Sequence, residues 1–202
     1  MTGWRQSVQA YADAAAWFLE TAGEVGDRWE QPGLGEWDVR ALVGHTSRSF
    51  VTVETYLAQP PDRVEIDSAA GYYLAAREVA GPSVAHRGIE AGRALGDDPV
   101  AALHDMADRV LTLVAGCSGE ELLTSIVGGM RLADYLPTRT FEIAVHTTDL
   151  AAALGCPAEV PASAAAETLA VLGRVAAADG RAADILLALT GRRPLPDPFS
   201  LL

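Results

Sequence analysis

Apolar side chains recur at helical spacing through most of this chain, and this periodicity limits the possible folds more than any other feature of the sequence. Between positions 38 and 57 the apolar residues fall on one side of the segment when successive residues are placed about 100° apart, as in an α-helix. They are Val39, Leu42, Val43, Phe50, Val53 and Leu57. Asp38 precedes them and is suited to accept the first free N–H groups of such a helix. The segment therefore predicts an amphipathic helix that ends near Leu57.

Glycine and proline divide the rest of the chain into further helical segments. We expect helices over 4–22, 99–115, 161–178 and 180–190, a weaker helical region over 68–95 interrupted at Gly81-Pro82, and a long helix ending near Gly155. Residues 122–127 predict a short extended arm, and residues 29–37 a loop. The abundance of alanine favours closely packed helices over sheet. The prediction is an all-α fold, with a helical bundle over residues 1–157 and a small C-terminal helical extension over 158–202.

Charge and composition exclude several classes of partner. The chain has 27 acidic and 15 basic residues and a formal net charge of −12. Such a surface repels phosphate backbones and anionic membranes, so we expect neither nucleic acid nor membrane as a partner. No stretch reaches the roughly 18 apolar residues of a membrane span, and a signal peptide is not evident. Cys117 and Cys156 are isolated, as is usual in a reducing compartment. We therefore expect a cytoplasmic monomer or homodimer.

A carboxylate and an imidazole four residues apart indicate a metal site. Residues i and i+4 share one face of a helix, so Glu142 and His146 can point at the same atom. Together they would supply two of the three ligands of a catalytic divalent-metal site. His45 is the best candidate for the third, because it lies at the edge of the apolar stripe of the helix that begins after Asp38. His86 and His104 lie in more polar surroundings, and we expect both to be exposed.

Arg139 and Asp149 lie on the same helical face as this pair, within an arc of about 80°. Asp149 is suited to accept the free N–H of a metal-bound histidine, and Arg139 to do similar work or to hold an anionic substrate group. The alternative is an ordinary network within the helix. Trp29 and Trp37, in the loop before His45, are expected to anchor that loop on the bundle rather than to stack on a substrate.

Two segments carry a resemblance to a known family. Residues 29–45 (WEQPGLGEWDVRALVGH) and 135–150 (YLPTRTFEIAVHTTDL) resemble the two metal-ligand helices of the mycothiol-dependent maleylpyruvate isomerase family. That family belongs to the DinB-like four-helix bundles, and the resemblance implies the same fold here. By position, it implies His45, Glu142 and His146 as the metal ligands.

The resemblance also implies a chemistry. Two imidazoles and one carboxylate leave coordination positions open on a divalent metal; zinc suits them best, and nickel or ferrous iron also accept them. With a low-molecular-weight thiol, for which the family implies mycothiol, such a site would catalyse S-transfer to, or isomerisation of, a small electrophilic substrate. With water it would be a hydrolase. A non-catalytic bundle that binds metal or a small ligand is the other alternative.

Overall fold

The computed structural model describes residues 2–79 and 83–202. The described residues are mostly helical, which confirms the predicted all-α fold. The helices are α1 (Thr2–Gly23), α2 (Val39–Leu57), α3 (Ala69–Val79), α4 (Ser83–Ala94), α5 (Pro99–Ala115), α6 (Leu132–Leu154), α7 (Ala162–Ala178) and α8 (Ala182–Leu189). The predicted interruption at Gly81-Pro82 lies outside the described residues.

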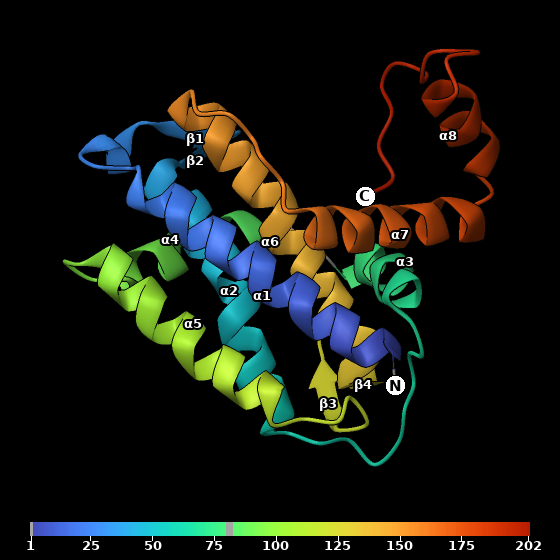
Figure 1. Cartoon of the computed structure of the whole chain (residues 1–202), viewed down its shortest axis with the longest axis horizontal. Helices are drawn as coiled ribbons and strands as arrows, with labels where there is room; N and C mark the ends of the chain where they lie inside the picture. Colours follow the sequence, from blue (N-terminus) through green and yellow to red (C-terminus); the bar gives the residue numbers. More distant parts are fainter. Residues whose placement is uncertain (1, 80–82) are drawn as a thin grey trace.

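Helices α1, α2, α5 and α6 form a four-helix bundle in which each helix packs against two of the others (Figure 1). Their apolar faces meet in a core of fully buried side chains. The largest of these are Tyr11, Phe18, Leu42, Phe50, Leu103, Tyr135, Leu136, Ile143 and Leu150. Phe50 lies between α1 and α2, with its ring centroid 5.9 Å from that of Phe18. This core fixes the two helices, α2 and α6, that carry the three candidate ligands.

The remaining helices pack around the bundle. Helix α4 packs closely on α2, α3 contacts α6 and α7, and α7 lies across α1 and α6 (Figure 1). The contact between α2 and α4 is glycine on glycine: a Cβ built on Gly44 would lie 2.1 Å from the backbone nitrogen of Gly92. Only a residue without a side chain allows this approach. Because Gly44 directly precedes His45, the contact also fixes where His45 lies.

The helix ends agree with the sequence signals. The carboxylate of Asp38 accepts a hydrogen bond from the backbone N–H of Ala41 at 2.7 Å, and Asp98 does the same for Ala101 at 3.1 Å. Gly155 ends α6 in the left-handed conformation, with φ of 69°. These local signals explain why the starts of α2 and α5 and the end of α6 were predictable.

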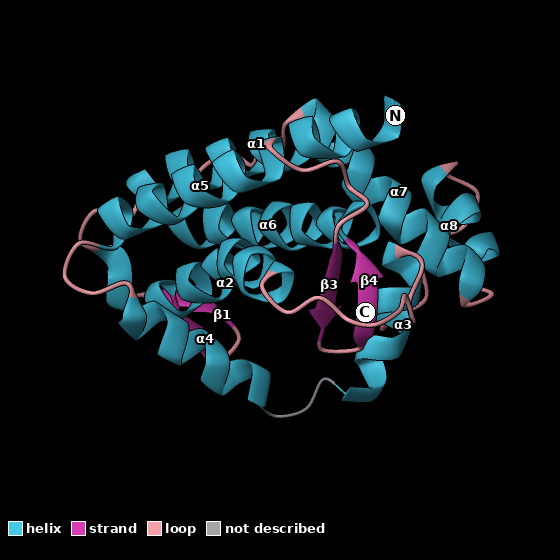
Figure 2. Cartoon of the chain, turned by 90° about the horizontal axis from the view of Figure 1, so that it is seen from below, coloured by secondary structure: helices cyan, strands magenta, loops and turns pink. Residues whose placement is uncertain are grey.

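Two small hairpins are the main departure from the predicted elements. The expected arm is strand β3 (Leu122–Ser125), which pairs antiparallel with β4 (Gly128–Arg131) beside α2 and α6 (Figure 2). The expected loop contains a 3-10 turn (Arg28–Glu30) and a hairpin of β1 (Pro32–Leu34) and β2 (Trp37–Asp38). Within the described ranges, no helix is both long and apolar enough to cross a bilayer.

Candidate metal centre

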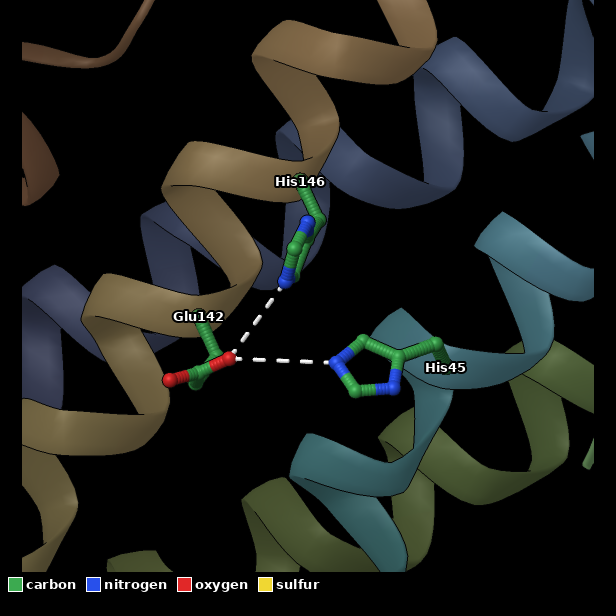
Figure 3. A group of neighbouring side chains, drawn as sticks. All are labelled: His45, Glu142 and His146. Atoms are coloured by element: carbon green, nitrogen blue, oxygen red, sulfur yellow. Dashed lines mark ion pairs between the residues drawn. The ribbon is translucent and has the colours of Figure 1, made fainter. Parts of the chain in front are cut away.

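The structure brings His45, Glu142 and His146 together at the interface of α2 and α6 (Figure 3). Glu142 Oε2 lies 3.4 Å from His146 Nε2 and 4.0 Å from His45 Nε2. One donor atom from each residue lies within 4.8 Å of the other two. The three side chains are mostly buried, with exposed fractions of 17%, 21% and 16% in chain order. Two neighbouring helices therefore place one carboxylate and two imidazoles around a common point.

The charges at this point are unevenly distributed among the three residues. Burial lowers the pKa of His45, and the charge of His146 adds to this, so that the value is about 4. Burial alone would also lower the pKa of His146, but hydrogen bonds to Asp149 and Glu142 and their negative charges raise it to about 9. At neutral pH the metal-free site therefore holds a neutral His45 and a protonated His146. The 4.0 Å contact of His45 with Glu142 is then not an ion pair.

Glu142 is charged in this arrangement. Burial raises the pKa of its carboxyl, but the hydrogen bond from His146, the positive charges of Arg139 and His146 and the hydrogen bond from Tyr73 together lower it to about 2. A carboxylate that is ionised and faces two imidazoles is suited to bind a cation.

Two further side chains hold the candidate ligands in place. The carboxylate of Asp149 lies 3.1 Å from Nδ1 of His146, which leaves Nε2 of that ring directed at Glu142. The hydroxyl of Tyr73 on α3 lies 2.8 Å from Glu142 Oε1. Asp149 thus has the geometry that its predicted supporting role requires.

Arg139 lies deeper, at the wall of the site. Its side chain is buried, donates hydrogen bonds to Tyr72 Oη (3.2 Å) and Thr138 Oγ1 (3.0 Å), and packs over the ring of Tyr135. Burial would lower the pKa of Arg139, but Tyr135, Tyr72 and the charge of Glu142 outweigh it, so the guanidinium keeps its proton. It contributes a fixed positive charge beside Glu142.

The two other histidines and the two loop tryptophans lie where the sequence predicts, but Trp37 has a further role. His86 and His104 are exposed, as expected. Trp29 packs against Arg40, whose guanidinium lies 5.2 Å from the ring centroid. Trp37 donates a hydrogen bond to the carbonyl of Ala85 on α4 and also covers the site, with its ring centroid 4.5 Å from that of His45. Trp37 therefore anchors the loop and forms part of the site wall.

A cavity of about 540 Å³ opens beside the three candidate ligands, which form part of its lining. Aromatic side chains (Trp37, Tyr56, Tyr72 and Tyr73) and four arginines (Arg48, Arg77, Arg87 and Arg139) also line it. Arg77 is engaged by Asp179 and by the carbonyl of Leu201. Among the described residues, no carboxylate lies within ion-pair distance of Arg48. In a protein of net charge −12, this cavity is a local concentration of positive charge.

The donor set fits a divalent metal ion. Ligands bound at about 2.0–2.2 Å to one tetrahedral ion lie roughly 3.3–3.6 Å apart. The 3.4 Å separation of Glu142 Oε2 and His146 Nε2 already matches this. His45 Nε2 is 4.0 Å from Glu142 Oε2, a few tenths of an ångström too distant, and all three donor atoms lie within 4.8 Å of one another. In addition, neither ring nitrogen of His45 is within hydrogen-bond distance of a partner in the described part of the chain. A cation at Nε2 would give that nitrogen a partner, whereas the buried Nδ1 would still have no hydrogen-bond partner among the described residues.

Comparison with known proteins gives one match. The model of the mycothiol maleylpyruvate isomerase N-terminal domain family matches residues 11–151. The chain belongs to this family. All three candidate ligands, with Arg139 and Asp149, lie inside the matched range, whereas α7 and α8 lie outside it. Neither the curated proteins nor the solved structures gave a match.

Sequence reasoning missed two residues that this family member places at the site. Tyr73 approaches Glu142 from a position 69 residues away, and no local pattern indicates such a contact. Arg48 was detectable, because it follows His45 by three residues and so lies on nearly the same face of α2. The three-residue spacing between His45 and Arg48 was the signal that could have identified this arginine.

Proposed function

We propose that the chain binds one divalent metal ion through His45, Glu142 and His146 and uses it to activate a low-molecular-weight thiol. Zinc suits this donor set best, with nickel or ferrous iron as alternatives. The family name supplies mycothiol as the thiol. The reaction would be S-transfer to, or isomerisation of, a small electrophile. We assign the metal site to residues 1–157 and treat 158–202 as an extension packed on the bundle.

The observation that carries this proposal is the position of the three ligands in the wall of a cavity of about 540 Å³. A purely structural metal site is closed and fully ligated, whereas three protein ligands beside an open space leave room for cosubstrate and substrate. When bound, a divalent metal would lower the pKa of a coordinated thiol and favour the nucleophilic thiolate.

The residues of the chain have separate roles in this proposal. Asp149 accepts a hydrogen bond from Nδ1–H of His146 and so keeps Nε2 directed at the site. The aromatic side chains give the cavity a largely apolar wall against which an organic substrate can pack. Arg139 and Arg48 supply positive charge to the wall, which favours an electrophile that carries an anionic group such as a carboxylate.

Cobalt substitution tests this proposal directly. Thiolate ligation to cobalt adds a sulfur-to-metal charge-transfer band, so titrating mycothiol into the cobalt-loaded protein should produce that band. Glu142→Ala serves as the control in which the band should be absent. Thiol consumption with a panel of electrophiles would then identify the substrate. Bound cobalt without a band at millimolar thiol would instead support a hydrolase or a non-catalytic binding protein.

A further inference from the structure

The two carboxylate oxygens of Glu142 have different surroundings. Oε2 faces both imidazoles, 3.4 Å from His146 Nε2 and 4.0 Å from His45 Nε2. Oε1 faces α3 instead and lies 2.8 Å from the hydroxyl of Tyr73. One oxygen is therefore directed at the candidate metal position and the other at a phenol.

The position of Tyr73 is fixed by its packing. Its ring is buried, with centroids 5.0 Å from Phe141 and 5.3 Å from Tyr72. Its hydroxyl also lies 3.1 Å from the carbonyl oxygen of Thr138, and its single proton can be donated to only one of the two acceptors. The charged carboxylate is both the closer and the stronger acceptor. The proton of Tyr73 is thus directed at Glu142 Oε1.

Such a hydrogen bond has a consequence for metal coordination. A carboxylate can bind a cation through one oxygen or through both. An oxygen that accepts a hydrogen bond from a rigidly held phenol is directed away from the cation. We propose that Tyr73 is a positioning residue that restricts Glu142 to one ligand oxygen and so keeps a coordination position free for the thiol. This inference rests on the proposed metal site.

Tyr72 provides a matched control. It is the neighbour of Tyr73 on α3, it is equally buried, and its ring contacts that of Tyr73. Its hydroxyl accepts a hydrogen bond from Arg139 Nη2 at 3.2 Å rather than donating to Glu142. Tyr72→Phe therefore removes a buried hydroxyl from the same wall without removing a hydrogen bond to the carboxylate.

The test compares cobalt-loaded wild type, Tyr73→Phe and Tyr72→Phe. Cobalt with four or five ligands absorbs visible light much more strongly than cobalt with six. We expect Tyr73→Phe to weaken these bands as Glu142 becomes bidentate, and to lower metal affinity about 10–100-fold, as for other supporting residues of metal sites. Tyr72→Phe should keep the wild-type spectrum. A Tyr73→Phe spectrum equal to that of wild type, with or without a loss of affinity, would overturn the proposal.

Wild-type protein allows an independent measurement if Tyr73→Phe does not fold. In the infrared difference spectrum on metal addition, one ligated oxygen gives a wide separation of the symmetric and asymmetric carboxylate stretches, and two give a narrow one. The proposal expects the wide separation, and a narrow one would contradict it. If wild type binds no metal at all, the proposed function itself fails, which distinguishes that result from a failure of this inference alone.

Discussion

The proton on His146 links metal binding to pH at the scale of a single residue. Asp149 and Glu142 raise the pKa of His146 to about 9 in the metal-free protein, while His45 is already neutral above about pH 4. A metal ion must displace the Nε2 proton of His146, so binding releases one proton below pH 9. We expect the apparent affinity to rise about tenfold per pH unit between pH 6 and pH 8.

Competition with a chelator at several pH values measures this dependence. Asp149→Asn removes one of the charges that hold the proton, so its affinity should depend less steeply on pH near neutrality. The variant should still bind about 10–100-fold more weakly than wild type at pH 9, because a neutral amide oxygen is a weaker acceptor for the Nδ1–H of His146 than a carboxylate. An affinity that is constant from pH 6 to pH 8 in wild type would contradict the displacement of a proton from His146 by the metal.

Arg48 is expected to bind an anionic group of the substrate. A hydrogen bond to a charged group contributes about 1.5–3 kcal/mol, so Arg48→Gln should lower kcat/KM about 10–100-fold for a carboxylate-bearing electrophile. For the matching carboxamide the loss should be small. Arg5→Gln, an exposed arginine on α1 outside the cavity lining, is the control for net charge. Equal losses for both substrates would contradict an anion-binding role.

At the scale of elements, the close packing of α2 on α4 determines where His45 lies. A methyl group on Gly44 would overlap the backbone of Gly92, which cannot move without displacing α4. Adding a methyl group to a well-packed core typically costs roughly 1–3 kcal/mol, and we expect Gly44→Ala to destabilise the fold by at least this amount. Gly173→Ala, in the exposed middle of α7 with free space around it, should stabilise by up to about 1 kcal/mol. Chemical denaturation measures the free energy of unfolding of both variants. An unchanged value for Gly44→Ala would show that α2 and α4 separate easily.

The helices and the hairpins differ in how far sequence predicts them. Helices α2, α5 and α6 are specified locally, by apolar periodicity and by the caps at Asp38, Asp98 and Gly155. Strand β3 pairs with β4, which follows it after two residues, and the carbonyl of Gly129 in β4 accepts backbone hydrogen bonds from residues 65 and 66. The extended character of β3 had a local signal, whereas the contact of the hairpin with residues 65 and 66 is a property of the tertiary structure.

The candidate site divides in the same way. Glu142 and His146 were predictable as a pair because one turn of helix separates them. The third histidine required a choice among three, which the edge of an apolar stripe and the family resemblance guided. Tyr73 depends on how α3 packs against α6, and that packing is a property of the tertiary structure alone.

At the scale of the whole molecule, a bound ion would connect α2 to α6 and so stabilise the folded chain. A ligand present at 100 times its Kd adds about 2.7 kcal/mol to the free energy of unfolding. For a domain of this size that corresponds to a rise in Tm of about 5–10 °C. Thermal unfolding with and without zinc measures the effect. Glu142→Ala should show no rise, and a rise of equal size in this variant would indicate binding elsewhere.

The most direct test of the central claim is a calorimetric titration of metal-free protein with zinc. The chain offers a matched control in His86 and Glu90 on α4, a second histidine–glutamate pair at i, i+4 spacing whose side chains lie 3.1 Å apart but are mostly exposed. We expect one zinc ion per chain for wild type and for His86→Ala, and no tight binding for His146→Ala. A wild-type protein that binds no zinc, or a His146→Ala variant that binds it as tightly as wild type, would contradict the account.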